Sequence, residues 1–248
     1  MIFGKKLEAS LIVMCIFTFI CSSQPSVMSF VETGQNNIYN KGYFSQSIFP
    51  SYDFKKNSLD AGVLWTFGGQ REKNFAGYSL KATHGFTLLK QSFAISGFYL
   101  WEPFSTELRE INWGVILTCD LPHFQLALGN NYRTYRFGKA YIPSNEVMSG
   151  KYRIVEPGNL IYLFQYLLNK KEEPWNLTIS LTNNDYFIIE QETNPIVIVK
   201  GVYRINENIG SFLDLGYKSA GLLNLKVNHF GYFFRLGIKW NIKNRQDI

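Results

Sequence analysis

Apolar and polar residues alternate along much of this chain, so successive side chains would point to opposite faces of a β-strand. The alternation is strict in 59–67, 76–88, 110–120, 175–182 and 232–242. It is weaker in 93–101, 124–137, 160–169, 196–206 and 209–218, and residues 160–168 are apolar on both faces. Between 222 and 242 it changes phase near 228–231, which indicates a bulge or an extended loop. The pattern predicts an all-β protein of about ten strands.

Composition agrees with strands and turns, because the 248 residues include 20 Gly, 21 Phe and 15 Tyr. A mean hydropathy of -0.09 excludes both a disordered chain and a polytopic helical membrane protein. It does not separate a soluble β protein from a transmembrane barrel, whose lipid-facing residues alternate with polar ones. The net charge of +6 comes without a block of like charges, so nucleic acid is not an expected partner.

The first 23 residues have the layout of a secretory signal peptide, with Lys5 and Lys6 before an apolar run from Leu11 to Ile20. The run is shorter than the roughly 20 apolar residues that a membrane-spanning helix needs. We expect residues 1–23 to be removed after Ser23, with a lipid anchor on Cys21 as the alternative. Cleavage would leave Cys119 without a partner cysteine, so no intramolecular disulfide is expected.

The connections between the predicted strands alternate in length. Short ones fall near Lys90, at 121–122, at 170–173 and at 207–208, and longer or more polar ones at 69–73, 102–107, 138–156 and 185–195. Tight turns at one end and long loops at the other are typical of transmembrane barrels. The order therefore predicts an up-and-down antiparallel transmembrane β-barrel over residues 58–242, followed by a short tail at 243–248. Residues 24–57 lack a clean alternation and could form a periplasmic segment, a plug, or an extra hairpin that raises the count to twelve.

The end of the chain resembles the β-signal of bacterial outer-membrane proteins, in which a polar residue and a glycine precede two hydrophobic residues spaced by one. Arg235, Gly237, Trp240 and Ile242 stand in that order, and six residues follow them. The resemblance covers the last strand alone. It implies a small barrel of the bacterial outer membrane, with the barrel-assembly machinery as a partner.

Charged residues in the predicted strands fall on the face opposite the aromatic residues. A Lys or Arg that faces lipid at mid-membrane costs roughly 2–4 kcal/mol, so we expect these side chains to face the lumen. The lumen candidates are Lys81, Glu110, Asp120, Arg133, Lys200, Arg204, Asp214, Arg235 and Lys239. Paired, they would form a structural polar core; unpaired, they would tune the passage of solutes. Trp65, Trp101, Trp175 and Trp240 lie near strand ends, where an interfacial aromatic girdle would place them.

The sequence carries no recognisable catalytic signature. His84, His123 and His229 lack the His-x-Ser spacing of outer-membrane phospholipases and deacylases, and the Asp-x-Asp and Asp-x-His pairs of omptin-like proteases do not occur. Walker loops, Cys or His metal clusters and nucleophile elbows are also missing from the sequence. We therefore expect no enzymatic activity, no cofactor and no metal site.

Two functions remain open from the sequence. The first is an outer-membrane barrel that forms a narrow channel for small solutes or serves a structural or surface-contact role, because ten strands are only slightly wider than the eight that side chains fill. Its expected partners are outer-membrane lipid and lipopolysaccharide, and an extracellular molecule bound through loop 138–156. The alternative is an exported soluble or lipid-tethered β-barrel or sandwich that binds a ligand, with aromatic residues inward and charges outward. The environment of Tyr232, Phe234, Leu236 and Ile238 separates the two.

Overall fold

The computed structural model describes residues 24–36, 41–67, 75–103, 108–137, 153–168, 173–186, 188–189, 195–218 and 231–242. Their strands are β1 (Gln24–Asn36), β2 (Lys41–Phe54), β3 (Asn57–Phe67), β4 (Phe75–Leu88), β5 (Gln91–Pro103), β6 (Leu108–Asp120), β7 (Phe124–Phe137), β8 (Arg153–Leu167), β9 (Trp175–Thr182), β10 (Asn184–Asp185), β11 (Ile188–Ile189), β12 (Ile196–Arg204), β13 (Ile209–Lys218) and β14 (Gly231–Asn241). Within these ranges, no helix is long and apolar enough to span a bilayer.

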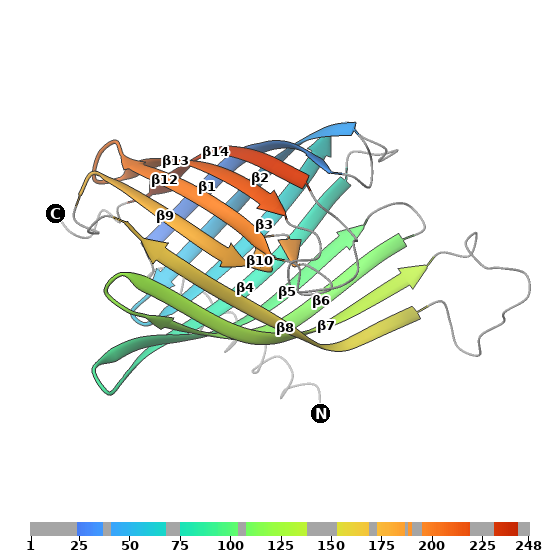
Figure 1. Ribbon diagram of the computed structural model, residues 1–248, viewed down its shortest axis with the longest axis horizontal. Coiled ribbons are helices and arrows are strands. Elements are labelled where there is room, and N and C mark those ends of the chain that lie inside the picture. The colour runs from blue at the N-terminus through green and yellow to red at the C-terminus, as the bar shows by residue number, and fades with distance from the viewer. Residues whose placement is uncertain are drawn as a thin grey trace, which may run out of the picture.

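Twelve of these strands form one closed antiparallel barrel, in the order β1-β14-β13-β12-β9-β8-β7-β6-β5-β4-β3-β2 (Figure 1). The barrel closes where β1 pairs with β14, from Ser26 opposite Asn241 to Asn36 opposite Gly231. The two short strands β10 and β11 pair with each other instead of joining the wall. The predicted up-and-down antiparallel barrel is confirmed, with twelve strands.

Several boundaries differ from the sequence-based prediction. Residues 24–36 and 41–54 form β1 and β2, so the extra hairpin is the alternative that the structure contains. The predicted loop 138–156 is too long, because β8 already begins at Arg153 and pairs with β7 there. The phase change after residue 222 is a connection, since β13 ends at Lys218 and β14 starts at Gly231. Residues 1–23, 138–152 and 243–248 lie outside the described ranges, as do the predictions made for them.

The longest connections between the strands lie at one end of the barrel. One end, here called the turn end, carries the connections 55–56, 89–90, 121–123, 168–174 and 205–208 together with Gln24 and Asn241. The opposite end, the loop end, carries 37–40, 68–74, 104–107, 138–152, 183–195 and 219–230. The longest connections all lie at the loop end, as the sequence predicted for a transmembrane barrel.

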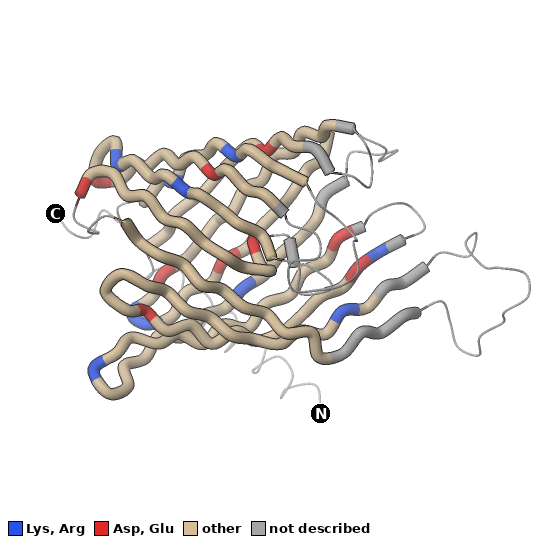
Figure 2. Tube along the Cα trace, viewed as in Figure 1, with Lys and Arg blue, Asp and Glu red and all other residues tan. Residues whose placement is uncertain are grey.

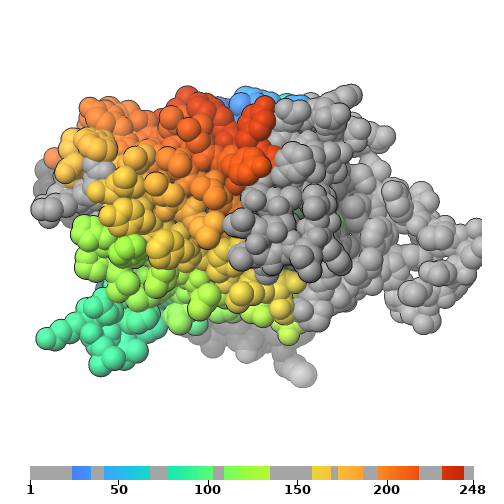
Figure 3. Space-filling view, in the orientation of Figure 1, coloured from blue at the N-terminus to red at the C-terminus, as the bar shows by residue number. Residues whose placement is uncertain are grey.

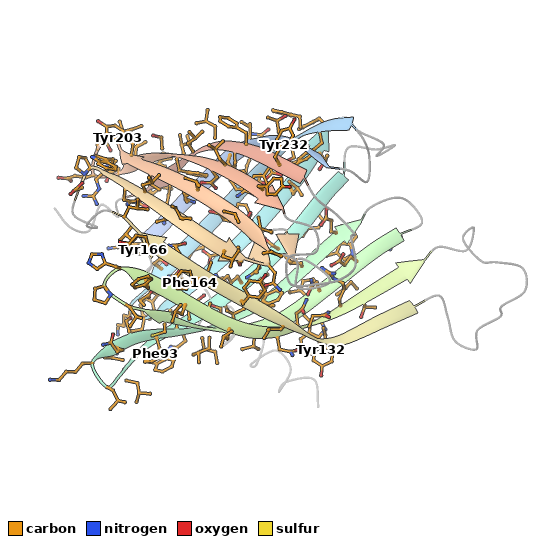
Figure 4. The ribbon with its side chains drawn as sticks, in the orientation of Figure 1. Phe93, Tyr132, Phe164, Tyr166, Tyr203 and Tyr232 are labelled. Carbon is orange, nitrogen blue, oxygen red and sulfur yellow. The ribbon has the colours of Figure 1, made fainter. Side chains whose placement is uncertain are left out.

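The outer surface of the barrel is apolar and aromatic. Leu213, Leu215 and Ile238 are 40%, 50% and 53% exposed and alternate along their strands with buried side chains. Figure 4 shows labelled rings on the outer surface near both ends, with Phe93, Tyr166 and Tyr203 towards the turn end and Tyr132 and Tyr232 towards the loop end. The space-filling view shows β9, β12, β13 and β14 forming one broad face of this surface (Figure 3). Exposed aliphatic side chains between aromatic rings are the pattern of a lipid-facing surface.

Tryptophan side chains also lie near the two ends of the barrel. Trp175 and Trp240 lie at the turn end of β9 and β14, and both are about half exposed. Trp65 and Trp101 lie near the loop end of β3 and β5, and the fifth tryptophan, Trp113 on β6, stacks on Tyr132 towards the same end. This placement is the one expected for interfacial girdles.

Inward-facing aromatic rings lie flat against the wall because the neighbouring strand offers glycine. A Cβ at Gly216 would collide with the ring of Phe233, and one at Gly237 would collide with the ring of Phe212. Gly62 accommodates the ring of Phe49 in the same way. The glycines let these rings pack onto the wall instead of crossing the lumen.

Candidate functional site

Most charged side chains of the described strands turn inward, and the most deeply buried ones form two clusters on the lumen side. Figure 2 shows how sparsely Lys, Arg, Asp and Glu occur along the strands. One cluster belongs to β1, β13 and β14 and surrounds Arg235, and the other belongs to β6 and β7 and contains Glu110 and Arg133. Both lie within the closed wall, where a charge needs a partner.

Arg235 on β14 joins three carboxylates. Its Nε and Nη2 donate to Oε2 of Glu32 on β1 at 3.0 and 2.6 Å, and its Nη1 donates to Oδ2 of Asp214 on β13 at 3.2 Å. Its Nη2 also donates to Oδ2 of Asp185, which belongs to β10. The guanidinium is 1% exposed, so its charge is satisfied by these partners and not by water.

Aromatic rings enclose the same guanidinium. Its Cζ lies 4.7 Å from the ring centroid of Phe30, 4.7 Å from that of Phe233 and 5.0 Å from that of Tyr186. Tyr43 donates its hydroxyl to the second oxygen of Glu32 at 2.7 Å. The arrangement combines cation–π contacts with charge-assisted hydrogen bonds, and it closes the seam where the first and last strands meet.

Asp185 and Tyr186 do not belong to the barrel wall. They lie in residues 183–186, here called the inward segment, which leaves the loop end of β9 and enters the lumen (Figure 1). The ring of Tyr186 lies 5.2 Å from those of Phe30 and Phe49, and Nζ of Lys200 donates to its hydroxyl at 3.4 Å. The segment therefore narrows the lumen beside the wall formed by β1, β2 and β12.

Asn183 anchors the inward segment where β9 stops pairing with β8. Its Nδ2 donates to the carbonyl of Leu160 at 2.7 Å, and its Oδ1 accepts from the backbone N–H of Tyr162 at 2.9 Å. Thr182 donates its hydroxyl to the carbonyl of Tyr162 at 2.7 Å. The amide side chain of Asn183 thus hydrogen-bonds the backbone groups of β8 that a longer β9 would have paired. The chain can therefore turn inward without leaving these backbone groups unsatisfied.

The second cluster forms a chain of polar groups across β6 and β7. Arg133 Nε lies 2.7 Å from Oε1 of Glu110, and Asn112 donates to the same oxygen at 3.3 Å. Asn131 donates in turn to Oδ1 of Asn112 at 2.7 Å. Both asparagines are fully buried, so this side of the lumen is packed near the loop end, and Oδ1 of Asn131 is left without a hydrogen-bond partner among the described residues.

The remaining lumen candidates lie closer to the turn end. Lys200 is 3.7 Å from Oδ1 of Asp214, and Asp120 accepts from Gln125 at 2.6 Å. Lys81, Arg204 and Lys239 are exposed and have no ion-pair partner among the described residues. Of the candidates with partners, Lys200, Asp214 and Arg235 therefore lie beside the inward segment, whereas Asp120 lies at the turn end.

A cavity of about 680 Å³ lies inside the barrel and reaches from the inward segment towards the turn end. Asp185, Tyr186 and Lys200 line its deep part, and Arg204, Lys239 and Asn241 line it near the turn end. Asp60 on β3 also lines it and stands opposite Lys81 in the register of β3 and β4. The open part of the lumen thus lies between the inward segment and the turn end.

Sequence reasoning missed Glu32, Asp60, Asp185 and Tyr186. Asp60 lies in a predicted strand on the face opposite Ala61 and Val63, so alternation could have found it. Glu32 falls in a segment whose pattern is not clean, and residues 185–195 were interpreted as an ordinary external loop. The local sequence carries no signal that Asp185 turns inward, because its partner Arg235 is 50 positions away.

The described residues offer little for catalysis. They contain no group of three or more His, Cys, Asp or Glu side chains that could hold a metal ion. Cys119 is half-buried and alternates with the inward-facing Thr118 and Asp120, which places it on the outer side of β6. His84 pairs its Nδ1 with Oδ1 of Asn57 at 2.8 Å near a turn. None of these groups forms a nucleophile–base pair.

Solved structures with the same architecture are bacterial outer-membrane barrels. The KdgM porin matches over 87% of this chain and 99% of its own, with a TM-score of 0.51 and 12% identity. The outer membrane protein Omp33 of Acinetobacter baumannii matches over 90% and 100%, with a TM-score of 0.50 and 12% identity. An outer membrane channel from Pseudomonas putida F1 matches over 89% and 96%, with a TM-score of 0.50 and 10% identity.

At such low identity these likenesses show the fold, a membrane barrel of the outer-membrane type. No protein-family model matches the sequence. The search of curated proteins also finds no match.

Proposed function

We propose that this protein is a narrow channel of the bacterial outer membrane, which lets small solutes pass a constriction formed by the inward segment. The observation that carries the proposal is the cavity of about 680 Å³ enclosed by a closed twelve-stranded wall. A wall of this size is wider than the eight-stranded barrels that side chains fill completely. The apolar outer surface supplies the bilayer contact that a channel requires.

The orientation follows from the loops. Outer-membrane barrels have short turns on the periplasmic side and long loops outside, so the turn end would face the periplasm and the loop end the exterior. A solute would pass the inward segment near the loop-end half of the lumen and then enter the cavity. In this role the clusters around Arg235 and Glu110 hold the constriction in place, and no catalytic chemistry is assigned to them.

The ending of the chain fits assembly by the barrel-assembly machinery. Gly237 faces inward against Phe212 and Phe30, Trp240 is exposed on the outer surface, and Ile242 donates its N–H to the carbonyl of Pro25 at 2.8 Å. Arg235, Gly237, Trp240 and Ile242 would thus serve both as the recognition signal and as the closing strand. Outer-membrane lipid and lipopolysaccharide are the surrounding partners, and the connection 138–152 is the proposed contact with extracellular molecules.

Expression with residues 1–23 and fractionation of the envelope test this function. We expect the protein in the outer-membrane fraction, with faster migration on an SDS gel before boiling than after it. Liposomes that carry the folded protein should swell in isosmotic solutions of small sugars. A protein found in the soluble periplasm without a mobility shift would contradict the membrane barrel, and a membrane barrel without swelling would contradict an open lumen.

A further inference from the structure

The cavity between the inward segment and the turn end is layered. Its lining near the turn end is polar: Ser51, Gln125, Gln165, Arg204, Lys239 and Asn241. Deeper along the same or neighbouring strands the lining contains a set of apolar side chains, with polar ones such as Ser79 and Ser180 between them: Phe49, Phe98, Ile116, Leu163 and Phe212. We call these two sets the polar mouth and the apolar band.

Single strands repeat the layering. On β2, Ser51 lies nearer the turn end and Phe49 two positions deeper, and β8 has Gln165 and Leu163 in the same relation. Inward side chains two positions apart occupy successive levels of a barrel wall. An apolar band inside a water-filled passage leaves apolar surface in contact with water, which costs free energy unless a solute covers it.

The cavity lining carries charges of both signs, and its two cations at the polar mouth, Arg204 and Lys239, have no ion-pair partner among the described residues. Lys81, Lys200, Arg204 and Lys239 line the cavity, whereas two of its four carboxylates, Asp185 and Asp214, are bound to Arg235. Asp60 and Glu207 are the other two carboxylates in the lining. Lysine and arginine near a polar mouth attract an anionic group, and that attraction is stronger in a confined space than in bulk water.

We propose that this cavity is a binding site for a small amphipathic organic anion, whose apolar or aromatic body lies in the apolar band and whose carboxylate faces Arg204 and Lys239. The volume of about 680 Å³ falls within the range of small-molecule sites. Tyr186 lines the deep side of the cavity and adds an aromatic ring to it. The inference rests on the proposed channel function and narrows it to a class of solute.

Titration of the folded full-length chain in zwitterionic detergent tests the site directly, with benzoate, benzamide and glucuronate as probes and detergent alone as the blank. Benzoate has both the ring and the carboxylate, benzamide lacks the charge, and glucuronate lacks the apolar body. Calorimetry should show benzoate binding at least about fivefold more tightly than either of the others. Equal affinity for benzoate and benzamide, equal affinity for benzoate and glucuronate, or no benzoate heat above the blank would each overturn the proposal.

Two variants and a control locate the binding. Lys239→Gln should weaken benzoate roughly fivefold and leave benzamide unchanged, whereas Phe98→Ser should weaken both ligands. Lys56→Gln removes a charge from an exposed turn outside the cavity and should change neither. If Lys56→Gln and Lys239→Gln behave alike, the anion does not bind in the cavity.

The binding result and the channel result can be told apart. A chain that swells liposomes but does not bind benzoate overturns the proposed site and leaves the channel in place. A chain that binds benzoate with the expected variant pattern but passes no solute overturns the channel and retains the site.

Discussion

Arg235 and Asp185 meet inside the barrel, where Nη2 of the guanidinium lies 2.8 Å from Oδ2 of the carboxylate. One residue belongs to the closing strand and the other to a segment that left the wall after β9. The contact ties the constriction to the seam between β1 and β14. The position of the inward segment therefore depends on the closure of the barrel, and the two can be tested through the same arginine.

Arg235→Met should destabilise the barrel strongly. The change leaves Glu32, Asp185 and Asp214 close together without the guanidinium that joins them. Loss of one partner from a buried ion pair costs about 3–5 kcal/mol. Urea unfolding of refolded protein in detergent micelles, followed by tryptophan fluorescence, measures the free energy of unfolding without the assembly machinery.

Arg204→Met is the matched control for that experiment, because Arg204 is exposed and has no ion-pair partner among the described residues. It should change the free energy of unfolding by less than about 1 kcal/mol. Similar losses in the two variants would show that the cluster around Arg235 does not hold the structure together.

Ile179→Arg should destabilise the protein in lipid much more than Ser180→Arg. Ile179 is 42% exposed on the outer surface, and Ser180 is the next residue of β9 and lines the cavity. An arginine that faces lipid costs roughly 2–4 kcal/mol near the bilayer centre, whereas one in a polar lumen does not incur that cost. Unfolding from phosphatidylcholine vesicles in urea compares the two variants.

If Ser180→Arg destabilised the protein more than Ile179→Arg, the inward and outward faces of the strands would be the reverse of those described. Aromatic residues would then pack inside a soluble barrel, as in the alternative interpretation of the sequence. In that case Ile179→Arg would disrupt a core, and Ser180→Arg would lie in solvent.

Lys90→Gly should stabilise the β4–β5 hairpin by about 1 kcal/mol. Lys90 has a φ of 66° and follows Leu89, which has a φ of 50°, so both residues of this turn adopt the left-handed conformation that glycine accepts without strain. The gain should appear as a higher urea midpoint with an unchanged slope.

Lys56→Gly is the control for the turn. Lys56 lies in the β2–β3 turn, but its φ is not positive. Glycine there adds freedom to the unfolded chain without relieving strain, so it should not stabilise the protein. Equal stabilisation by both substitutions would refute the explanation based on backbone conformation.

Periodicity was sufficient to predict most of the wall. The bounds of 124–137, 175–182 and 209–218 agree with β7, β9 and β13, although the alternation is strict only in 175–182. The first hairpin was left open because its inward face mixes Ser45, Ser47 and Phe49 with charged residues, which weakens the alternation. In 160–168 both faces are apolar because Ile161 and Leu163 contribute to an apolar cluster on the lumen side.

The candidate site was less accessible to sequence reasoning. Alternation could assign Arg235 and Asp214 to one face, but it could not show that Asp185 and Glu32 complete their cluster. These contacts join residues 21, 50 and 203 positions apart. They depend on barrel closure and on the inward turn at Asn183, neither of which is encoded in a local pattern.

Single-channel recording in planar bilayers tests the central claim most directly, namely that the lumen is open and is narrowed by the inward segment. The unaltered chain should give discrete conductance steps, and Tyr186→Ala should enlarge them because it removes a ring from the constriction. Tyr203→Ala makes the same change on the outer surface, where the side chain is 55% exposed, and should leave the steps unchanged. Absence of steps from the unaltered chain, or equal conductance for all three proteins, would contradict the claim.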